Sequence, residues 1–134
     1  MSVGPVSGNG IAIVLPPGKT AFWTVNTQAS WNQFTQLRDS GGNVIFTAQG
    51  ASTGGHSPTQ IGSGSFQIQD QSGNYTLYIG INGGGSWSQV LWDDVTLALA
   101  DTIMCSNFNF IAEDGADQDY NDTHVSLTWF ARLG

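Results

Sequence analysis

The chain has 134 residues, a length that suits one domain able to bury about two-thirds of its unfolded surface. Hydrophobic residues make up 40% and aromatic residues 11%, so a core can form, but 18 glycines and only 10% charged residues argue against a helical bundle. The net charge of −7 disfavours nucleic acid and anionic membranes as partners, because both are bound chiefly through Lys and Arg.

The start of the chain, residues 1–10, has neither the basic segment nor the apolar segment of a classical signal peptide. No apolar run approaches the roughly 20 residues that a membrane span requires. We therefore expect a soluble protein without membrane insertion.

Short runs rich in Val, Ile, Thr, Phe, Tyr and Trp follow one another along the chain, separated by stretches rich in Gly and Ser. Such runs predict short strands joined by turns. They cover residues 10–15, 20–26, 31–37, 43–48, 64–69, 74–81, 88–92, 94–100, 108–112 and 123–130. The turn segments 39–43 and 70–74 supply Gly and Asn for positions with positive φ. The pattern predicts an all-β fold, a single-domain antiparallel β-sandwich of about nine strands over residues 1–134.

The last predicted strand, 123–130, shows a clear alternation of side-chain character. Val125, Leu127 and Trp129 alternate with Ser126 and Thr128. This spacing directs one apolar face inward and one polar face outward.

A loop between the last two predicted strands contains half of the acidic residues of the chain. Five carboxylates occupy ten consecutive positions: Glu113, Asp114, Asp117, Asp119 and Asp122. Carboxylates a few ångströms apart repel one another by about 1 kcal/mol per pair in water and about 4 kcal/mol at an effective dielectric of 20. Because strands hold both ends of the loop, a bound cation is expected to offset this repulsion.

The ligand atoms available in this loop are oxygens, which favour calcium. Asp117, Asp119 and Asn121 have the D-x-D-x-N spacing that lets alternate residues of a tight turn face one ion. The loop is not an EF-hand, because Asp122 stands where that motif needs Gly and Thr128 where it needs Glu. Five carboxylates exceed the need of one divalent ion, so two calcium ions are expected, with Asp119 and Asp122 as bridging ligands.

The segment "EDGADQDYND", followed by a strand with Trp129 and by Leu133 and Gly134, resembles the two-calcium, fucose/mannose-binding soluble lectins of bacteria. Every fixed position of that family's ten-residue motif is present. The resemblance covers about the last 25 residues, with a weaker similarity at "VLPPGKT". It implies a lectin that coordinates sugar hydroxyls to calcium and breaks no bond, so the chain is not expected to be an enzyme.

The resemblance also implies a role for each matching residue. One calcium ion would be held by Glu113, Asp117, Asp119 and Asp122, and the other by Asp119, Asn121, Asp122, the side chain of Asn26 and the carboxylate of Gly134 from a partner subunit. Gln28 is an alternative to Asn26. Asp114 and Asp117 would accept hydrogen bonds from the sugar, and Thr27, Gln28 and Ala29 would form the specificity loop.

The end of the chain departs from the family pattern. "WFARLG" has two more residues between Trp129 and Gly134 than the family's W-P-L-G and lacks its proline. This difference leaves open the path of the last residues and the role of Arg132, either at a subunit boundary or close to the site. Trp31, beside the specificity loop, is the tryptophan best placed to stack on a sugar.

The resemblance implies fucose- or mannose-bearing glycans as partners and a homodimer or a dimer of dimers in which the C-terminus crosses to the partner's site. Because such glycans lie outside the cell, it also implies display on the cell surface or release by a non-classical route. Two other functions remain open: a calcium-stabilised structural or adhesion module without sugar affinity, and a metal-assisted hydrolase.

Overall fold

The computed structural model describes residues 3–115 and 118–132, and these contain eleven β-strands and no α-helix. The strands are β1 (Val3–Ser7), β2 (Asn9–Val14), β3 (Thr20–Thr27), β4 (Gln33–Arg38), β5 (Val44–Gly50), β6 (Thr59–Gln67), β7 (Asn74–Ile81), β8 (Ser86–Trp87), β9 (Gln89–Leu99), β10 (Thr102–Glu113) and β11 (Thr123–Phe130), with a short 3-10 turn, η1 (Asn82–Gly84), before β8.

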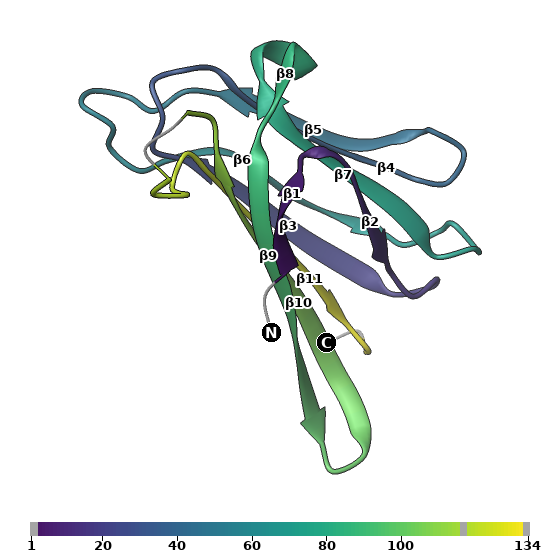
Figure 1. The fold of residues 1–134 in the computed structure, drawn as a ribbon. Helices are drawn as coiled ribbons and strands as arrows, with labels where there is room; N and C mark the ends of the chain where they lie inside the picture. Colours follow the sequence, from purple (N-terminus) through teal and green to yellow (C-terminus); the bar gives the residue numbers. More distant parts are fainter. Residues whose placement is uncertain (1–2, 116–117, 133–134) are drawn as a thin grey trace.

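The strands form two antiparallel sheets that pack face to face (Figure 1), which confirms the predicted β-sandwich. One sheet has the order β1-β9-β10-β11-β3-β6. The other has the order β2-β7-β4-β5, with β8 paired to β7. Strands β10, β11 and β3 are therefore neighbours, although β3 is far from the other two in the sequence.

The core comes from the alternation of side chains along these strands. Val125 and Leu127 of β11 are fully buried, as the sequence predicts, whereas Ser126 and Thr128 are half-buried on the opposite face. Phe108 and Phe110 of β10 pack on the same core. These apolar contacts fix the ends of β10 and β11, and so they fix where the acidic loop begins and ends.

The number and limits of the strands differ from the sequence prediction. The predicted strands 88–92 and 94–100 form one strand, β9, because Asp93 and Asp94 continue the ladder opposite Asn109 and Phe108 of β10. Both β9 and β10 extend beyond the rest of the sheet as a hairpin (Figure 1). β1 and the two-residue β8 were not predicted, because neither has a run of apolar residues long enough to indicate a strand.

Strand direction brings three loops to the same end of the sandwich. β3 and β10 end there, and β4, β6 and β11 begin there. The loops are residues 28–32, 51–58 and the acidic loop, 114–122, of which 116–117 are not described. No helix long and apolar enough to cross a membrane is found in the described residues.

Candidate functional site

The acidic loop closes tightly between its two strands. Ala112 lies opposite Thr123 in the β10–β11 ladder, and the Asp122 amide donates a hydrogen bond to the Ala112 carbonyl oxygen at 3.1 Å. Glu113 is the last residue of β10, and Asp122 precedes β11 directly. The ladder therefore places Glu113 and Asp122 side by side, nine positions apart in the sequence.

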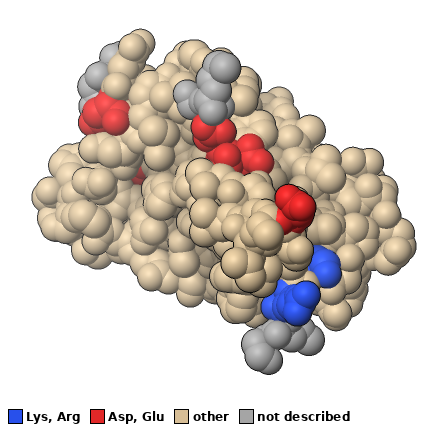
Figure 2. All heavy atoms as spheres, turned by 90° about the horizontal axis from the view of Figure 1, so that it is seen from below, with Lys and Arg blue, Asp and Glu red and all other residues tan. Residues whose placement is uncertain are grey.

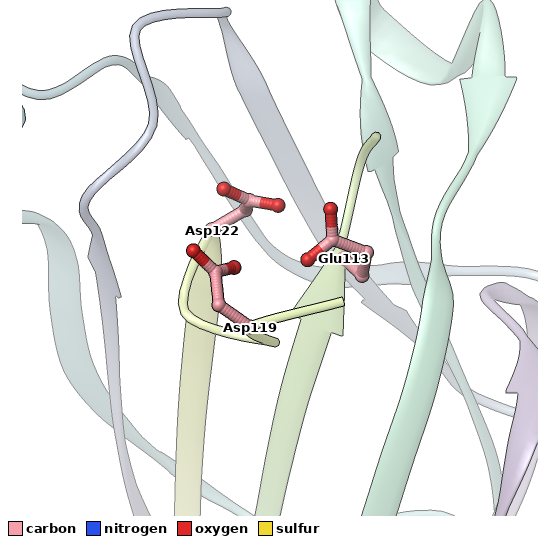
Figure 3. A group of neighbouring side chains, drawn as sticks. All are labelled: Glu113, Asp119 and Asp122. Carbon is pink, nitrogen blue, oxygen red and sulfur yellow. The ribbon is translucent and has the colours of Figure 1, made fainter. Parts of the chain in front are cut away.

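Three carboxylates of the loop converge, as the sequence predicts (Figure 3). One oxygen from each of Glu113, Asp119 and Asp122 lies within 4.8 Å of the others. Glu113 is 3% exposed and Asp122 is 9% exposed, whereas Asp119 is open to solvent. Two of the three negative charges are therefore removed from most of the water that would screen them.

Backbone amides hold the carboxylates in this arrangement. Glu113 accepts hydrogen bonds from the amides of Gly115 at 3.0 Å and Tyr120 at 3.1 Å, one on each oxygen. The Asp114 amide donates to Asp122 at 2.8 Å. Gln118 and Tyr120 have positive φ values of 56° and 53°, a conformation that bends the chain back towards β10. The cluster is thus part of the folded backbone of the loop.

The electrostatics of Asp122 show that its negative charge is disfavoured in this cluster. Burial, together with the neighbouring carboxylates of Asp114 and Asp119, raises the pKa of Asp122 to about 6 against the lowering effect of the Asp114 amide. A divalent cation with oxygen ligands would reverse this penalty, so the residues fit a calcium site.

The amide of Asn121 also lies at the cluster. In the orientation that satisfies both groups, its nitrogen donates to the two oxygens of Asp119 at 2.8 and 3.0 Å. Asn121 therefore supplies a further polar group beside Asp119, and its predicted role as a calcium ligand stays a prediction. Of the other predicted ligands, Asp117 and Gly134 lie outside the described residues.

The end of β3 supports the acidic loop. Thr27 is 1% exposed, and its hydroxyl donates to the Asp122 carbonyl oxygen at 2.5 Å and accepts from the Ala29 amide at 2.9 Å. Gln28 lines a cavity together with Asp119, Asn121 and Asp122. Asn26 and Gln28 both line a second cavity with Asn121 and with His124, the partner of Asn26 in the β3–β11 ladder. Both candidate early-loop ligands thus share a cavity with Asn121, and Gln28 also lines the one that contains Asp119 and Asp122.

Asp114 is oriented by a residue that the sequence analysis missed. Gln33, the first residue of β4, is fully buried, and its amide nitrogen donates to an Asp114 carboxylate oxygen at 2.7 Å. Its amide oxygen accepts from the Thr123 hydroxyl at 2.7 Å. Local patterns offered little signal for Gln33, because polar and apolar residues are mixed in the predicted strand 31–37.

A cavity of about 400 Å³ opens beside the carboxylates. The acidic loop forms one side, through Glu113, Asp114, Gly115 and Asp122. Residues from two other loops form the rest, which are Ala29, Ser30, Trp31 and His56. Sequence patterns did not place His56 here, because it lies in a Gly/Ser-rich loop far from the acidic segment.

Comparison with known proteins supports the reading of this site. The family model Fucose-binding lectin II (PA-IIL) matches residues 13–131. A Chromobacterium violaceum lectin in complex with alpha-methyl-fucoside is similar in structure, with a TM-score of 0.70, 25% identity and coverage of 92% of this chain and 96% of that chain. A Ralstonia solanacearum high-affinity mannose-binding lectin has a TM-score of 0.68, 26% identity and coverage of 92% and 96%.

The C-terminal domain of a Burkholderia cenocepacia lectin shares the fold, with a TM-score of 0.70 at 23% identity over 96% of this chain and 100% of that chain. A search of curated protein sequences found no match.

Proposed function

The chain belongs to the fucose-binding lectin II family, and from this premise we propose that residues 1–134 form one calcium-dependent lectin domain that recognises fucose- or mannose-type monosaccharides. The family and the similar structures are carbohydrate-binding lectins, which are not enzymes. The resemblance in the acidic segment and the family match thus agree. The hydrolase alternative is set aside.

The observation that carries the proposal is the convergence of Glu113, Asp119 and Asp122 within 4.8 Å, with two of them buried. Carboxylates that are crowded together and removed from water raise one another's free energy, and a bound cation lowers it. The five carboxylates of the loop carry five negative charges, and two calcium ions would leave a net charge of about −1. The proposed cofactor is therefore two calcium ions per subunit.

The proposed ligands follow the family motif. Glu113, Asp117, Asp119 and Asp122 hold one ion, and Asp119, Asn121 and Asp122 hold the other. Between Gln28 and Asn26, the arrangement favours Gln28 as the early-loop ligand, because Gln28 shares a cavity with Asp119, Asn121 and Asp122.

The chain's own residues orient the sugar. When bound, calcium offers coordination sites at which adjacent sugar hydroxyls replace water. Asp114 accepts a hydrogen bond from a sugar hydroxyl, and Gln33 holds the Asp114 carboxylate in place by donating to it. Asp117 provides a second carboxylate that accepts a charge-assisted hydrogen bond from the sugar. The segment of Thr27, Gln28 and Ala29 lies nearest the sugar and determines the specificity. Thr27 holds this segment in place, because its hydroxyl donates to the Asp122 carbonyl oxygen and accepts from the Ala29 amide.

Completion of the site by a second subunit is also part of the proposal. β11 has eight residues and leads away from the cluster over about 26 Å. The carboxylate of Gly134 that the family motif places on calcium is therefore proposed to come from another copy of the chain.

The outer face of the six-stranded sheet supports assembly. Phe22 and Phe130 are 51% and 43% exposed and pack edge to face, with centroids 5.8 Å apart. Val95 and Leu97 of the protruding hairpin are exposed on the same face. Seen from below relative to Figure 1, the molecule shows a few acidic and basic side chains among a majority of uncharged ones (Figure 2). Such a surface suits a homodimer or a dimer of dimers, which would present several sites to a glycan-bearing surface.

The test is calorimetric titration with methyl α-L-fucoside and methyl α-D-mannoside, in calcium and again after chelation. We expect saturable heat for at least one sugar in calcium and none after chelation. A variant extended beyond Gly134 should bind calcium but lose sugar affinity. Calcium binding without heat from either sugar would contradict the lectin proposal and favour the calcium-stabilised structural module.

A further inference from the structure

A group of aromatic and basic side chains lies on the outer face of the five-stranded sheet, the sheet that does not carry the acidic loop. Leu37 of β4 and Leu77 of β7 are fully buried. Because side chains alternate along a strand, their neighbours Arg38 and Tyr78 point to the opposite, outer face. Trp87 of β8 joins them, with the ring centroids of Tyr78 and Trp87 5.6 Å apart. We call Arg38, Tyr78 and Trp87 the Trp87 patch.

The indole of Trp87 is held against glycine backbone. A Cβ atom at Gly80 would lie 2.9 Å from the indole, and one at Gly84 would lie 3.2 Å from it, so both positions need glycine for the ring to lie there. The ring of Phe34 packs on the indole with the centroids 6.4 Å apart. Trp87 is nonetheless 38% exposed. An indole that is both fixed and exposed can pack on a ligand with little further loss of side-chain entropy.

The guanidinium of Arg38 is fixed by two contacts but has no anionic partner within the described residues. Its Cζ atom lies 4.8 Å from the centroid of the Tyr78 ring, and its Nε donates to the side-chain oxygen of Gln36 at 2.6 Å. A guanidinium has five N–H donors, so the four on its terminal nitrogens remain for a ligand. Their planar arrangement matches the two oxygens of a carboxylate.

The charges around the patch favour an anionic group at Arg38. Arg38 is the only charged residue in β2, β4, β5, β7 and β8, although the chain as a whole has a net charge of −7. The next residue, Asp39, accepts hydrogen bonds from the amides of Gly41 and Asn43 within its own turn, at 3.0 and 2.9 Å. The carboxylate nearest to Arg38 in the sequence is therefore occupied by other donors, and the cation of the patch is left for a ligand.

We propose that the Trp87 patch binds a glucuronate-bearing oligosaccharide without calcium, at a site separate from the acidic loop. A glucose-configured pyranose has axial C–H groups on both faces, so it packs on the Trp87 indole, and a uronate carboxylate pairs with Arg38. In the sheet, Gly80 lies opposite Trp87 and Thr76 lies opposite Arg38, four residues apart on β7 and thus about 13 Å apart. One sugar ring does not span that length, so the ligand contains at least two rings.

The experiment is a calorimetric titration in chelator with the hyaluronan hexasaccharide, in which D-glucuronate and N-acetyl-D-glucosamine alternate, and with the methyl ester of the same hexasaccharide. We expect saturable binding of the acid and about tenfold weaker binding of the ester, because the ester cannot form the charge-assisted hydrogen bonds to Arg38. Raising the salt concentration from about 50 mM to about 500 mM should weaken binding of the acid and leave that of the ester unchanged.

Variants of the patch separate the two contacts. Arg38→Gln should weaken binding of the acid about tenfold and leave that of the ester unchanged, and Arg38→Lys, which keeps the charge but loses the planar fork, should restore part of the loss. Trp87→Ala should weaken binding of both ligands about three- to tenfold. Because Trp87→Ala also uncovers Phe34, the partner variant is Trp87→Phe, which keeps a ring and should recover part of the affinity.

Two matched controls lie outside the patch. Arg132→Gln makes the same change of charge at an exposed residue near the end of the chain, and Phe22→Ala truncates an aromatic side chain that is 51% exposed on the six-stranded sheet. Both should leave the affinity for the hexasaccharide unchanged. If Arg132→Gln weakened binding as much as Arg38→Gln, net charge would govern the affinity and the proposed site would be overturned.

The unmodified protein gives the remaining outcomes. Absence of binding in chelator, or equal affinity for the acid and the ester, would overturn the site. A Trp87→Ala variant with a changed sedimentation mass and an unchanged affinity would make Trp87 a subunit contact and would also overturn it. Titration of methyl α-L-fucoside in calcium tests the acidic loop independently, so failure of one site is distinguishable from failure of the other.

Discussion

Carboxylates lie at both ends of the β-sandwich, but their surroundings are opposite in kind. At the end formed by the β4–β5 and β6–β7 turns, Asp70 accepts four hydrogen bonds. They come from the amide and hydroxyl of Ser40, at 2.7 and 2.5 Å, and from the amide and hydroxyl of Ser72, at 2.9 and 2.7 Å. At the other end, the oxygens of Glu113, Asp119 and Asp122 approach one another.

The pKa values of the two ends move in opposite directions. The hydrogen bonds from Ser40 and Ser72 hold the pKa of Asp70 well below its ordinary value. Burial, together with nearby carboxylates, raises the pKa of Asp122 to about 6. A carboxylate surrounded by donors stabilises a turn by itself, whereas carboxylates surrounded by carboxylates need a ligand of positive charge. Acid content alone therefore does not identify a metal site, but the partners of each acid do.

The largest effect is expected from Asp122→Asn, which breaks the cluster while keeping the size of the side chain and an oxygen that can accept from the Asp114 amide. Calcium affinity should fall by more than about 100-fold, because loss of even an outer partner of a metal ligand costs about 10- to 100-fold. Calorimetric titration with calcium chloride measures this loss.

Asp70→Asn is the control, since it makes the same change in charge at the opposite end. It should leave calcium affinity within about twofold, because Asp70 lies beyond the screening length of about 8 Å at physiological salt. If both variants weakened calcium binding equally, net charge would govern the affinity, and the comparison between the two ends would fail.

The sequence was sufficient to predict these acids as a cluster because they are close in the chain. The segment 113–122 lies in one loop, and the alternation of Val125 and Leu127 indicates the strand that follows it. The neighbours that complete the site come from other strands and loops, and their positions depend on the β11–β3 and β3–β6 pairings and on the packing of the second sheet, which contains β4. For this reason Gln33 and His56 could not be placed from local patterns.

Gln33 allows a sharper comparison between the two ends of the sandwich. It donates a side-chain hydrogen bond to Asp114, as Ser40 and Ser72 donate to Asp70. Gln33→Leu removes the donor to Asp114 and the acceptor of the Thr123 hydroxyl. We expect monosaccharide affinity to fall about tenfold, as expected when a single charge-assisted hydrogen bond is lost. Stability should fall by about 1–3 kcal/mol, since the Thr123 hydroxyl is left buried without its acceptor.

A double variant separates the two effects of Gln33. Adding Thr123→Val to Gln33→Leu removes the stranded hydroxyl, so urea unfolding should show most of the stability restored. The sugar affinity, measured by calorimetry, should stay low, because Asp114 still lacks its donor. Recovery of both properties together would assign Gln33 to stability alone.

The smallest expected effect, and the most direct test of the two electrostatic environments, is the pH dependence of unfolding without metal. The folded-state pKa of Asp122 is raised to about 6 from 3.8, so the stability gained by its protonation is fully present below 3.8 and is lost as pH rises through 6. The pKa of Asp70 is lowered, so its contribution is present above 3.8 and is lost as pH falls below that value.

Urea unfolding in chelator between pH 3 and pH 7 should therefore give the two Asn variants opposite signs. Asp122→Asn should be more stable than the parent at pH 7, by about 1–2 kcal/mol, since one pKa unit corresponds to about 1.4 kcal/mol and water still screens part of the charge. This gain should fade towards pH 4. Asp70→Asn should be less stable than the parent at pH 7, with a difference that shrinks below pH 3.8. A destabilised Asp122→Asn at pH 7 would mean that the described chain already satisfies Asp122, and that the cluster does not require a cation.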